Sequence, residues 1–551
     1  ISLGLVGSEM CIRDRTDSSR ATLENEVLPE YLARQRWFPG SHAPARARLA
    51  YATPFTAAGG EYYWAEVEPE DGVEGLRAQA PFVLVWDETA QVQYPIARVR
   101  RGAEVGTLAD AFLQPGFVLG VVEALRASRE LDGRAAGKPG DKPGIIRYLP
   151  EPGLAEVEFG EEPALQWISG EQSNSSVIIG GHAILKLIRN VQPGVSPEVE
   201  LTRHLTRAGY ANIPALLGEV LRIDADGVPH TLAVLHAFVT NEGDAWTWTL
   251  DFLKRTLGAA LLGGDSPDEF EASLEGYTVM AATIGRRLAE LHNALAQPSD
   301  DPAFALRTAT KADTEGHAAR IIAQLNRAEQ DLRAVLDTLE APSHACAQWF
   351  FEHHARLVKQ VDAMAKALTG APLIRVHGDF HLGQVLVAQT DAYLIDFEGE
   401  PIQSLEARRQ VNTPYKDVAG MLRSFDYAAA SIARGDPLGG APTDANAGPA
   451  DTPAAPGAPV ELRDTLLARF GSRSAEAFLQ GYQEAASTAV ALPPAQEDPL
   501  LKLAVLEKAA YEVSYEAAHR PDWISIPLCA LTGLARELLQ AAAISSEEHA
   551  Q

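Results

Sequence analysis

The sequence is poor in cysteine, and this scarcity argues against two ways of stabilising a fold. Cys11, Cys346 and Cys529 stand far apart, without Cys-x-x-Cys spacing. A structural zinc site needs clustered cysteines, and a disulfide framework needs several cysteines that can pair. We therefore expect neither, and we expect a reducing, cytoplasmic environment.

Long apolar runs and an excess of positive charge are also missing. No run approaches the roughly 20 apolar residues that a membrane-spanning helix needs. The 551 residues carry a formal net charge of −27. This charge opposes binding to nucleic acids or anionic membranes, because their phosphate groups would be repelled. We expect neither as a partner.

The first fifteen residues differ from the rest of the chain. Residues 1–15, ISLGLVGSEMCIRDR, have no amphipathic period and do not begin with Met. They resemble a vector-derived translation artefact more than native sequence. We therefore leave them out of the expected fold.

The most informative stretch is RVHGDFHLGQVLVAQTDAYLIDFEGEP. Its two short apolar runs predict a pair of small strands, Val385–Val387 and Tyr393–Ile395. Asp379 precedes the first strand and Asp396 follows the second, so a hairpin brings both carboxylates, with Gln384, to one end. A Mg-nucleotide phosphotransferase needs one carboxylate to orient the acceptor hydroxyl, and another, with an amide, to hold Mg²⁺. The alternative is a buried hairpin with solvated acids at its ends.

The order of residues in this stretch resembles a known superfamily. His377-Gly378-Asp379, then Gln384, then Asp396-Phe397-Glu398 follow the order H-R-D, Asn, D-F-G of protein kinases. The H-G-D opening is similar to aminoglycoside and choline phosphotransferases. The longer strings HGDFHLGQVL and IDFEGEP resemble bacterial maltokinases, which phosphorylate maltose at its reducing end. Gln384 departs from the wider pattern, where Asn is usual.

This resemblance implies an α+β, bilobal, protein-kinase-like fold with an N-terminal α/β cap domain and a mainly helical C-lobe. It also implies ATP and Mg²⁺ as cofactors, and a maltose 1-phosphate product that feeds α-glucan (glycogen) synthesis. In some bacteria this unit is fused to trehalose synthase. The expected parts are a cap at 21–140, an N-lobe at 145–238, a C-lobe at 239–545 with the catalytic hairpin at 375–401, and a disordered Ala/Pro/Gly-rich insertion at 435–459.

The expected N-lobe contains a lysine inside an apolar strand. Lys186 lies in AILKLI, where an unpaired ammonium group is costly. We expect Lys186 to hold the α- and β-phosphates of ATP; the alternative is an edge-strand lysine that reaches water. A helix expected to open at Pro197 offers two acids as partners. We choose Glu200, which matches the acid position in the maltokinase-like pattern, and keep Glu198 as the fallback.

Two further N-lobe segments are expected at the nucleotide. The polar turn Ser173-Asn174-Ser175 can place backbone N–H groups and hydroxyls over phosphates, although it lacks the GxGxxG spacing. The strand Leu232–Phe238 ends where a kinase hinge meets adenine, so backbone groups from His236 to Phe238 are expected there.

The C-terminal string LEKAAYEVSYEAAHRPDWISIPL mixes aromatic and charged residues on one helix and the turn after it. Sugar recognition needs such a mixture, while the alternative is a packed helix with surface ion pairs. The pattern YExxYExxxRPxWxxIPL resembles the maltokinase C-terminal segment and favours the sugar site. The residues this resemblance assigns to maltose are Tyr511, Glu512, Arg520 and Trp523, with His381 and Glu398. Asp417 is expected to brace the catalytic loop.

The predicted activity is ATP-dependent phosphorylation of maltose, with Asp379 accepting the proton of the anomeric hydroxyl. One alternative is another small-molecule kinase of the same fold, acting on an aminoglycoside, choline or a different sugar. The other is an inactive kinase-like module that binds glucan or a partner enzyme. Such a module is expected to lack Lys186, Asp379 or Asp396, and all three are present.

Overall fold

The computed structural model describes the chain except for residues 1–8, 12–16, 39–42, 58–59, 71–75, 87–91, 93, 102, 133–143, 169–172, 262–266, 401–402, 436–459 and 549–551. Its residues fall into two compact units. The first, here the sheet unit, comprises Ile1–Thr206 and Pro214–Thr240. The second, the helical unit, comprises Arg207–Ile213 and Asn241–Gln551. The expected insertion at 435–459 lies, after Gly435, outside the described residues. None of the described helices is both long and apolar enough to cross a membrane.

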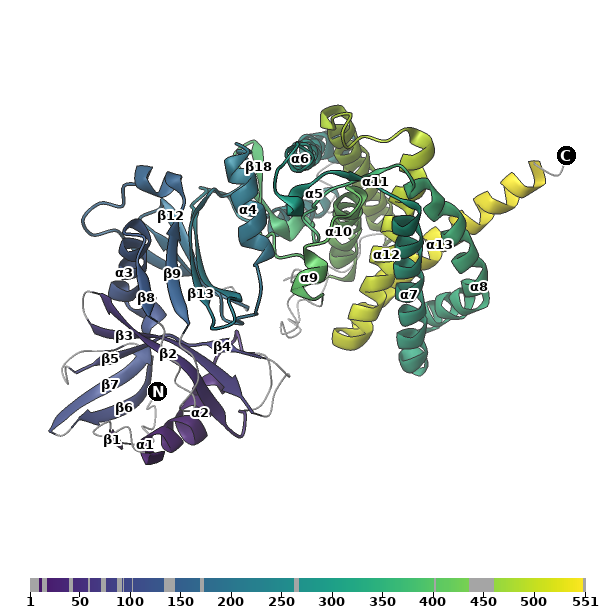
Figure 1. Cartoon of the computed structure of the whole chain (residues 1–551). Coiled ribbons are helices and arrows are strands. Elements are labelled where there is room, and N and C mark those ends of the chain that lie inside the picture. Colours follow the sequence, from purple (N-terminus) through teal and green to yellow (C-terminus); the bar gives the residue numbers. More distant parts are fainter. Residues whose placement is uncertain are drawn as a thin grey trace. The chain divides into compact units, whose positions relative to one another are not determined.

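The sheet unit opens with three short helical segments and a seven-stranded sheet in the order β1-β6-β7-β5-β3-β2, with β4 paired to β3 (Figure 1). The elements are β1 (Glu9–Cys11), α1 (Asp17–Thr22), η1 (Leu23–Val27), α2 (Leu28–Ala33), β2 (Ala47–Ala57), β3 (Gly60–Pro69), β4 (Ala78–Gln79), β5 (Phe82–Val85), β6 (Pro95–Arg101) and β7 (Glu104–Asp110). Tyr51, Thr53 and Phe55 of β2 are all buried, because side chains two residues apart share one face of a strand.

A second seven-stranded sheet follows, in the order β10-β11-β12-β14-β13-β9-β8. Its elements are η2 (Ala111–Leu113), α3 (Pro115–Arg126), β8 (Glu130–Asp132), β9 (Ile145–Pro150), η3 (Pro152–Glu156), β10 (Leu165–Ile168), β11 (Ser175–Ile179), β12 (Ala183–Leu187), α4 (Pro197–Arg207), β13 (Leu216–Ile223) and β14 (Pro229–Ala237). β8 pairs with β9, although its residues were expected in the cap.

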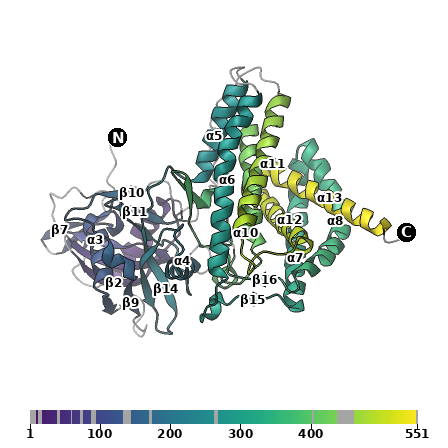
Figure 2. The ribbon, with the colours of Figure 1, turned by 90° about the horizontal axis from the view of Figure 1, so that it is seen from above.

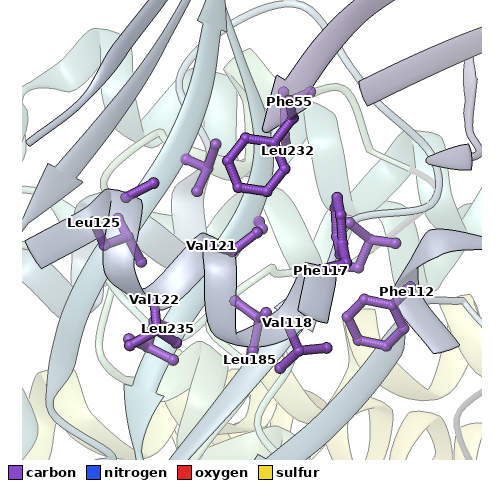
Figure 3. Packing of buried hydrophobic residues seen from close by; sticks show 14 of the residues in the cluster. Phe55, Phe112, Phe117, Val118, Val121, Val122, Leu125, Leu185, Leu232 and Leu235 are labelled. Carbon is purple, nitrogen blue, oxygen red and sulfur yellow. The ribbon is translucent and has the colours of Figure 1, made fainter. Parts of the chain in front are cut away.

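Helix α3 joins the two sheets into one core. Its buried side chains, among them Phe117 and Val121, pack in one cluster with Phe55 of β2 and Leu185 of β12 (Figure 3). A hydrogen bond also joins the two sheets, because Trp64 Nε1 of β3 donates to the Tyr148 hydroxyl of β9 at 2.7 Å. The cap and the N-lobe, expected as separate domains, therefore share a hydrophobic core.

Part of the segment expected to be non-native takes a place in this sheet. Glu9–Cys11 pairs in parallel with β6, with Glu9 opposite Arg98. These three residues therefore form a strand, although they were left out of the expected fold, and the non-native origin of residues 1–15 stays a prediction.

The helical unit carries two small two-stranded sheets and a set of long helices. Its elements are α5 (Ala245–Leu261), α6 (Pro267–Leu295), η4 (Pro302–Phe304), β15 (Arg307–Thr308), α7 (Lys311–Val335), η5 (Leu336–Thr338), α8 (Ala341–Ala365), η6 (Lys366–Leu368), β16 (Pro372–Leu373), η7 (Leu382–Gln384), β17 (Val385–Ala388), β18 (Asp391–Leu394), α9 (Leu405–Arg408), α10 (Tyr415–Arg434), α11 (Val460–Ala485), α12 (Pro494–His519), η8 (Pro521–Trp523) and α13 (Ser525–Glu548). The bilobal α+β, kinase-like fold expected from the sequence is the one observed.

Two close approaches set the packing of this unit. Helices α6 and α11 run side by side (Figure 2). A Cβ atom on Gly285 would lie 2.0 Å from the Phe478 carbonyl oxygen, so only glycine fits there. Gly420 of α10 is similar, because its Cβ would lie 2.3 Å from the Phe380 carbonyl oxygen. This second contact seats the segment after Asp379 directly on α10.

Candidate active site

The predicted catalytic hairpin is present, with slightly different bounds. β17 and β18 pair in antiparallel register from Val385 opposite Leu394 to Ala388 opposite Asp391. The turn is therefore two residues long, and Gln389 adopts a positive φ of 58°. Arg287 of α6 clamps the far end through two bonds to the Asp391 carboxylate, at 2.7 and 2.8 Å. The hairpin is thus fixed at the end away from Asp396.

Asp379 lies on the loop before this hairpin and is paired with a lysine from α12. Lys508 Nζ donates to Asp379 Oδ1 at 2.9 Å and to Glu400 Oε1 at 3.3 Å. Burial of Asp379 acts against its charged form, but the charge and hydrogen bond of Lys508 outweigh it and hold the pKa of Asp379 well below its ordinary value. Asp379 is therefore a carboxylate at neutral pH, able to accept a hydrogen bond from a hydroxyl.

Gln384 and Asp396 come together as predicted. Gln384 Nε2 donates to Asp396 Oδ2 at 3.1 Å. Asp396 also has a positive φ of 64°, a conformation that is costly for a residue with a Cβ atom and that often marks functional loops. A carboxylate beside an amide offers the oxygen ligands that Mg²⁺ prefers, once the Gln384 amide turns its oxygen toward the cation. The two residues fit the metal site expected from the sequence.

Asp417 of α10 holds the catalytic loop through backbone bonds. Its two carboxylate oxygens accept the N–H groups of His377 and Gly378, each at 2.8 Å. The same carboxylate contacts His292 Nε2 at 3.0 Å, and His292 Nδ1 contacts the Tyr482 hydroxyl at 2.9 Å. Asp417 and His292 are fully buried, so this is the bracing contact expected for Asp417.

His381 and Glu398 flank this cluster. His381 is buried, and burial lowers the pKa of its imidazole, which is therefore neutral. Its Nδ1 accepts the Gly383 N–H at 3.0 Å, so the ring proton is on Nε2. His381 Nε2 lies 3.4 Å from the Gln384 amide nitrogen, so this ring contacts the expected metal ligand, and its contact with a sugar stays a prediction. The Glu398 side chain is half-buried. The backbone carbonyl of Glu398 accepts a hydrogen bond from Arg408 Nη1 at 3.2 Å.

In the sheet unit, Lys186 forms an ion pair with Glu198, the acid kept as the fallback to Glu200. Lys186 Nζ donates to Glu198 Oε2 at 3.2 Å, and both side chains are largely buried. The two acids lie two residues apart on α4 and so point in different directions. Glu198, the fallback, therefore occupies the position of an orienting acid, and a role for Glu200 stays a prediction.

Two side chains of the polar turn Ser173-Asn174-Ser175 already form hydrogen bonds within the protein. Asn174 Oδ1 accepts the Arg189 N–H at 3.2 Å, and Ser175 Oγ accepts from Arg189 Nε at 2.8 Å. Arg189 also donates to Asp110 at 2.9 Å. The Asn174 and Ser175 side chains are therefore engaged in holding Arg189, and Ser173 is the exposed side chain of the three. Their phosphate contacts remain predictions.

The expected hinge region also uses one of its backbone groups within the protein. The Phe238 N–H donates to the His182 carbonyl at 2.9 Å, so Phe238 does not present this N–H to adenine. His236 is buried, and burial, with the nearby charge of Lys186, lowers the pKa of its imidazole to about 3. His236 is thus a neutral side chain beneath Lys186, and an adenine contact through its backbone remains a prediction.

The C-terminal residues assigned to maltose divide into two kinds. Glu512 accepts from Arg423 Nε at 2.9 Å, and Arg520 donates to Glu516 at 2.7 and 3.0 Å. These two charged side chains therefore pair within the protein. Tyr511 is half-buried and stacks on Tyr515, with 6.4 Å between ring centroids. Trp523 is also half-buried, and Arg520 lies 5.1 Å from its ring centroid.

Three charged residues at this site were missed by the sequence analysis: Lys508, Glu400 and Arg423. A signal existed for the first two. Lys508 precedes Tyr511 by three residues and Glu512 by four, so a helix places all three on one face. Glu400 belongs to the IDFEGEP string itself. Arg423 gives no such signal, because its partner Glu512 is 89 residues away.

The chain is similar in sequence to known phosphotransferases. Residues 165–429 match the phosphotransferase enzyme family, APH. A glucosamine kinase from Streptacidiphilus jiangxiensis is 28% identical over 377 residues, covering 67% of this chain and 73% of that protein. A glucosamine kinase from Mycolicibacterium smegmatis is 28% identical over 387 residues, covering 70% and 82%.

The fold comparison agrees. A structure of glucosamine kinase in complex with glucosamine, ADP and inorganic phosphate aligns over 92% of this chain and 98% of that one, with a TM-score of 0.59 and 22% sequence identity. These relatives are named glucosamine kinases, so the comparisons support the fold and the phosphotransferase class but give no support to maltose as the acceptor. Over residues 165–429 the chain is therefore similar to the phosphotransferase enzyme family, and its fold is protein-kinase-like.

Proposed function

We propose that this chain is a kinase that transfers the γ-phosphoryl group of ATP to a hydroxyl of a small sugar, with glucosamine or a close relative as the first candidate. The observation that carries the proposal is the braced loop of the helical unit, where Asp417 fixes the backbone at His377 and Gly378 next to Asp379. The names of the relatives direct the choice of acceptor toward an amino sugar.

In this mechanism Asp379 orients the acceptor hydroxyl and takes its proton. The acceptor oxygen forms a bond to the γ-phosphorus while the bond between this phosphorus and the β–γ bridging oxygen breaks, and ADP leaves. Gln384 and Asp396 would hold Mg²⁺, which supplies charge neutralisation when bound. Lys186, oriented by Glu198, would hold the α- and β-phosphates. Positioning and electrostatics supply most of the rate enhancement, so a weakly basic Asp379 is adequate.

Maltose is the second candidate acceptor. The stacked Tyr511 and Tyr515 rings favour it, because an aromatic face suits the C–H surface of a longer sugar. In that case the product would be maltose 1-phosphate, feeding α-glucan synthesis, and a trehalose synthase would be the expected fused or associated partner. A cytoplasmic location stays a prediction from the cysteine content.

The acceptor can be tested by phosphorus NMR of the protein with Mg-ATP and, in parallel, glucosamine, maltose, glucose or kanamycin. We expect a new phosphomonoester signal with glucosamine. Coupling to two protons would place the phosphate on the sugar CH₂OH group, and coupling to one proton would place it on a ring carbon. Transfer to maltose alone would favour the second candidate. Absence of transfer to all four sugars, with ADP still bound, would contradict the proposal.

The two acids give a matched test within α4. Glu198→Gln should lower kcat/KM for ATP by about 10²-fold, because Lys186 loses the partner that orients it. Glu200→Gln should change kcat/KM by less than about threefold, since Glu200 lies on another face of the helix. The measurement is initial rate against ATP concentration, with melting temperatures as a check on folding. Equal losses in both variants would contradict the assignment of Glu198.

A further inference from the structure

Lys508 is a largely buried cation at the reacting end of the helical unit that the mechanism above does not use. Its ammonium group bridges two carboxylates, at 2.9 Å from Asp379 Oδ1 and 3.3 Å from Glu400 Oε1. The side chains of Lys508, Asp379 and Glu400 are only 17, 15 and 8% exposed. A lysine in such surroundings needs a negatively charged partner, and the lysine in turn stabilises the charge of both carboxylates.

The position of Lys508 is fixed by the helix that carries it. On α12, Glu512 pairs with Arg423 of α10, and Glu507 accepts from Arg320 of α7 at 2.8 Å. Tyr511 adds a contact from one turn along, with its ring centroid 5.0 Å from Lys508 Nζ. The ammonium group is therefore positioned by helix α12, which ion pairs hold against α10 and α7.

Glu400 is tied down in the same way. Its second carboxylate oxygen lies 3.5 Å from Lys416 Nζ, one residue before the bracing Asp417. Asp379, Lys508, Glu400 and Lys416 thus form a row of alternating charge. Within this row, only one oxygen of Asp379 is engaged by Lys508, and the other is left for a different donor.

We propose that Lys508 is a positioning residue for the phosphoryl transfer: it holds Oδ1 of Asp379 so that Oδ2 faces the acceptor hydroxyl, and it separates the charge of Asp379 from that of Glu400. This inference rests on the proposed function. Without the ammonium group, two carboxylates would face each other in a poorly hydrated space, and Asp379 would turn away from Glu400. The carboxylate would then no longer meet the acceptor hydroxyl in a productive direction.

The kinetic test compares Lys508→Met, Lys508→Arg and the parent with the sugar that the parent phosphorylates. Lys508→Met should lower kcat by about 10²-fold, a typical loss when a reacting group is misplaced by about 1 Å. The KM for ATP should stay within about twofold of the parent, because Lys186 and Glu198 are unaltered. Lys508→Arg should recover most of the lost rate, since a guanidinium can donate to both carboxylates.

The matched control is Lys502→Met. Lys502 lies on the same helix and pairs with Asp498 at 2.8 Å, but its side chain is 40% exposed. This variant should keep the parent kcat. If Lys508→Met lowers the melting temperature, Lys508→Gln replaces it. A parent-like kcat in Lys508→Met, or an equal loss in Lys508→Met and Lys508→Arg, would overturn the proposal.

A structural test separates this inference from the choice of reaction. Crystal structures of the parent and Lys508→Met should show the Asp379 carboxylate rotated in the variant, with the loop backbone unchanged on Asp417. An unrotated carboxylate would overturn the role of Lys508, even if the protein proves to be a sugar kinase. A rotated carboxylate in a protein that phosphorylates no sugar would count against the proposed reaction and leave the positioning contact established.

Discussion

Replacing Asp379 by Asn is expected to lower kcat for sugar phosphorylation by about 10³- to 10⁴-fold, the upper range for loss of a general base. Asn keeps the shape of the side chain, but its amide oxygen is a poor proton acceptor. Lys508 would keep Glu400 as a carboxylate partner, so the loop should stay folded. The measurement is single-turnover transfer to the sugar, together with equilibrium binding of ADP, which should remain close to that of the parent.

The control for this prediction is Asp391→Asn, at the other end of the same hairpin. Asp391 pairs with Arg287, and its side chain is 34% exposed. Because a partly exposed ion pair contributes about 0–1 kcal/mol, this variant should lose a little stability and keep nearly all of its turnover. If Asp379→Asn kept a turnover within about tenfold of the parent, Asp379 could not be the general base that the mechanism requires.

Much of the helical unit could be predicted from periodicity. The apolar spacing at 277–295 falls inside α6, and the segment 417–430 falls inside α10. The hairpin was also predictable, because two short apolar runs flank a polar turn and allow few other arrangements. These elements are defined by local patterns, and a local pattern is visible in a single sequence.

The contacts that the sequence could not decide are those that depend on tertiary packing. Glu198 and Glu200 are equally plausible partners by sequence, and only the docking of α4 decides which acid meets Lys186. Glu512 has the residue type of a sugar ligand, but Arg423 from α10 claims its carboxylate. A sequence pattern predicts which face of a helix or strand carries a side chain. It does not predict which other element packs against that face, and this packing decides the contacts between distant elements.

The division between cap and N-lobe shows the same limit. The loop at 137–144 suggested a domain boundary, yet α3 from before this loop packs with β12 and β14 from after it. A Gly/Pro-rich loop indicates where the chain turns, and says little about whether the segments it joins share a core.

Replacing Asp417 by Asn is expected to be the most destabilising single change at the site, costing about 3 kcal/mol of unfolding free energy. The parent carboxylate accepts the N–H groups of His377 and Gly378 and contacts His292, with no exposure to water. An Asn side chain has one oxygen and a donating NH₂, so one of the loop N–H groups would face another donor. The catalytic loop would shift, and kcat should fall by about 10²-fold.

The pH dependence of this loss follows from the Asp417 carboxyl. Burial acts against its charged form, but the hydrogen bond and charge of His292, with the loop N–H groups, hold its pKa below the ordinary value. A lowered pKa in the folded state stabilises the protein above the unfolded-state pKa of about 3.9 and ceases to do so as the pH falls toward the folded-state pKa. Calorimetry should therefore show the full gap in melting temperature between parent and Asp417→Asn at pH 7, and a smaller gap below about pH 4.

A surface carboxylate provides the comparison for this last prediction. Asp498 pairs with Lys502, and its side chain is 65% exposed. Asp498→Asn should cost less than about 1 kcal/mol and leave kcat unchanged, because water replaces the lost contact. If Asp417→Asn behaved like Asp498→Asn, the backbone bonds at His377 and Gly378 could not be what holds Asp379 in place. The order of the catalytic loop would then have to come from its packing on Gly420 and from Lys508 alone.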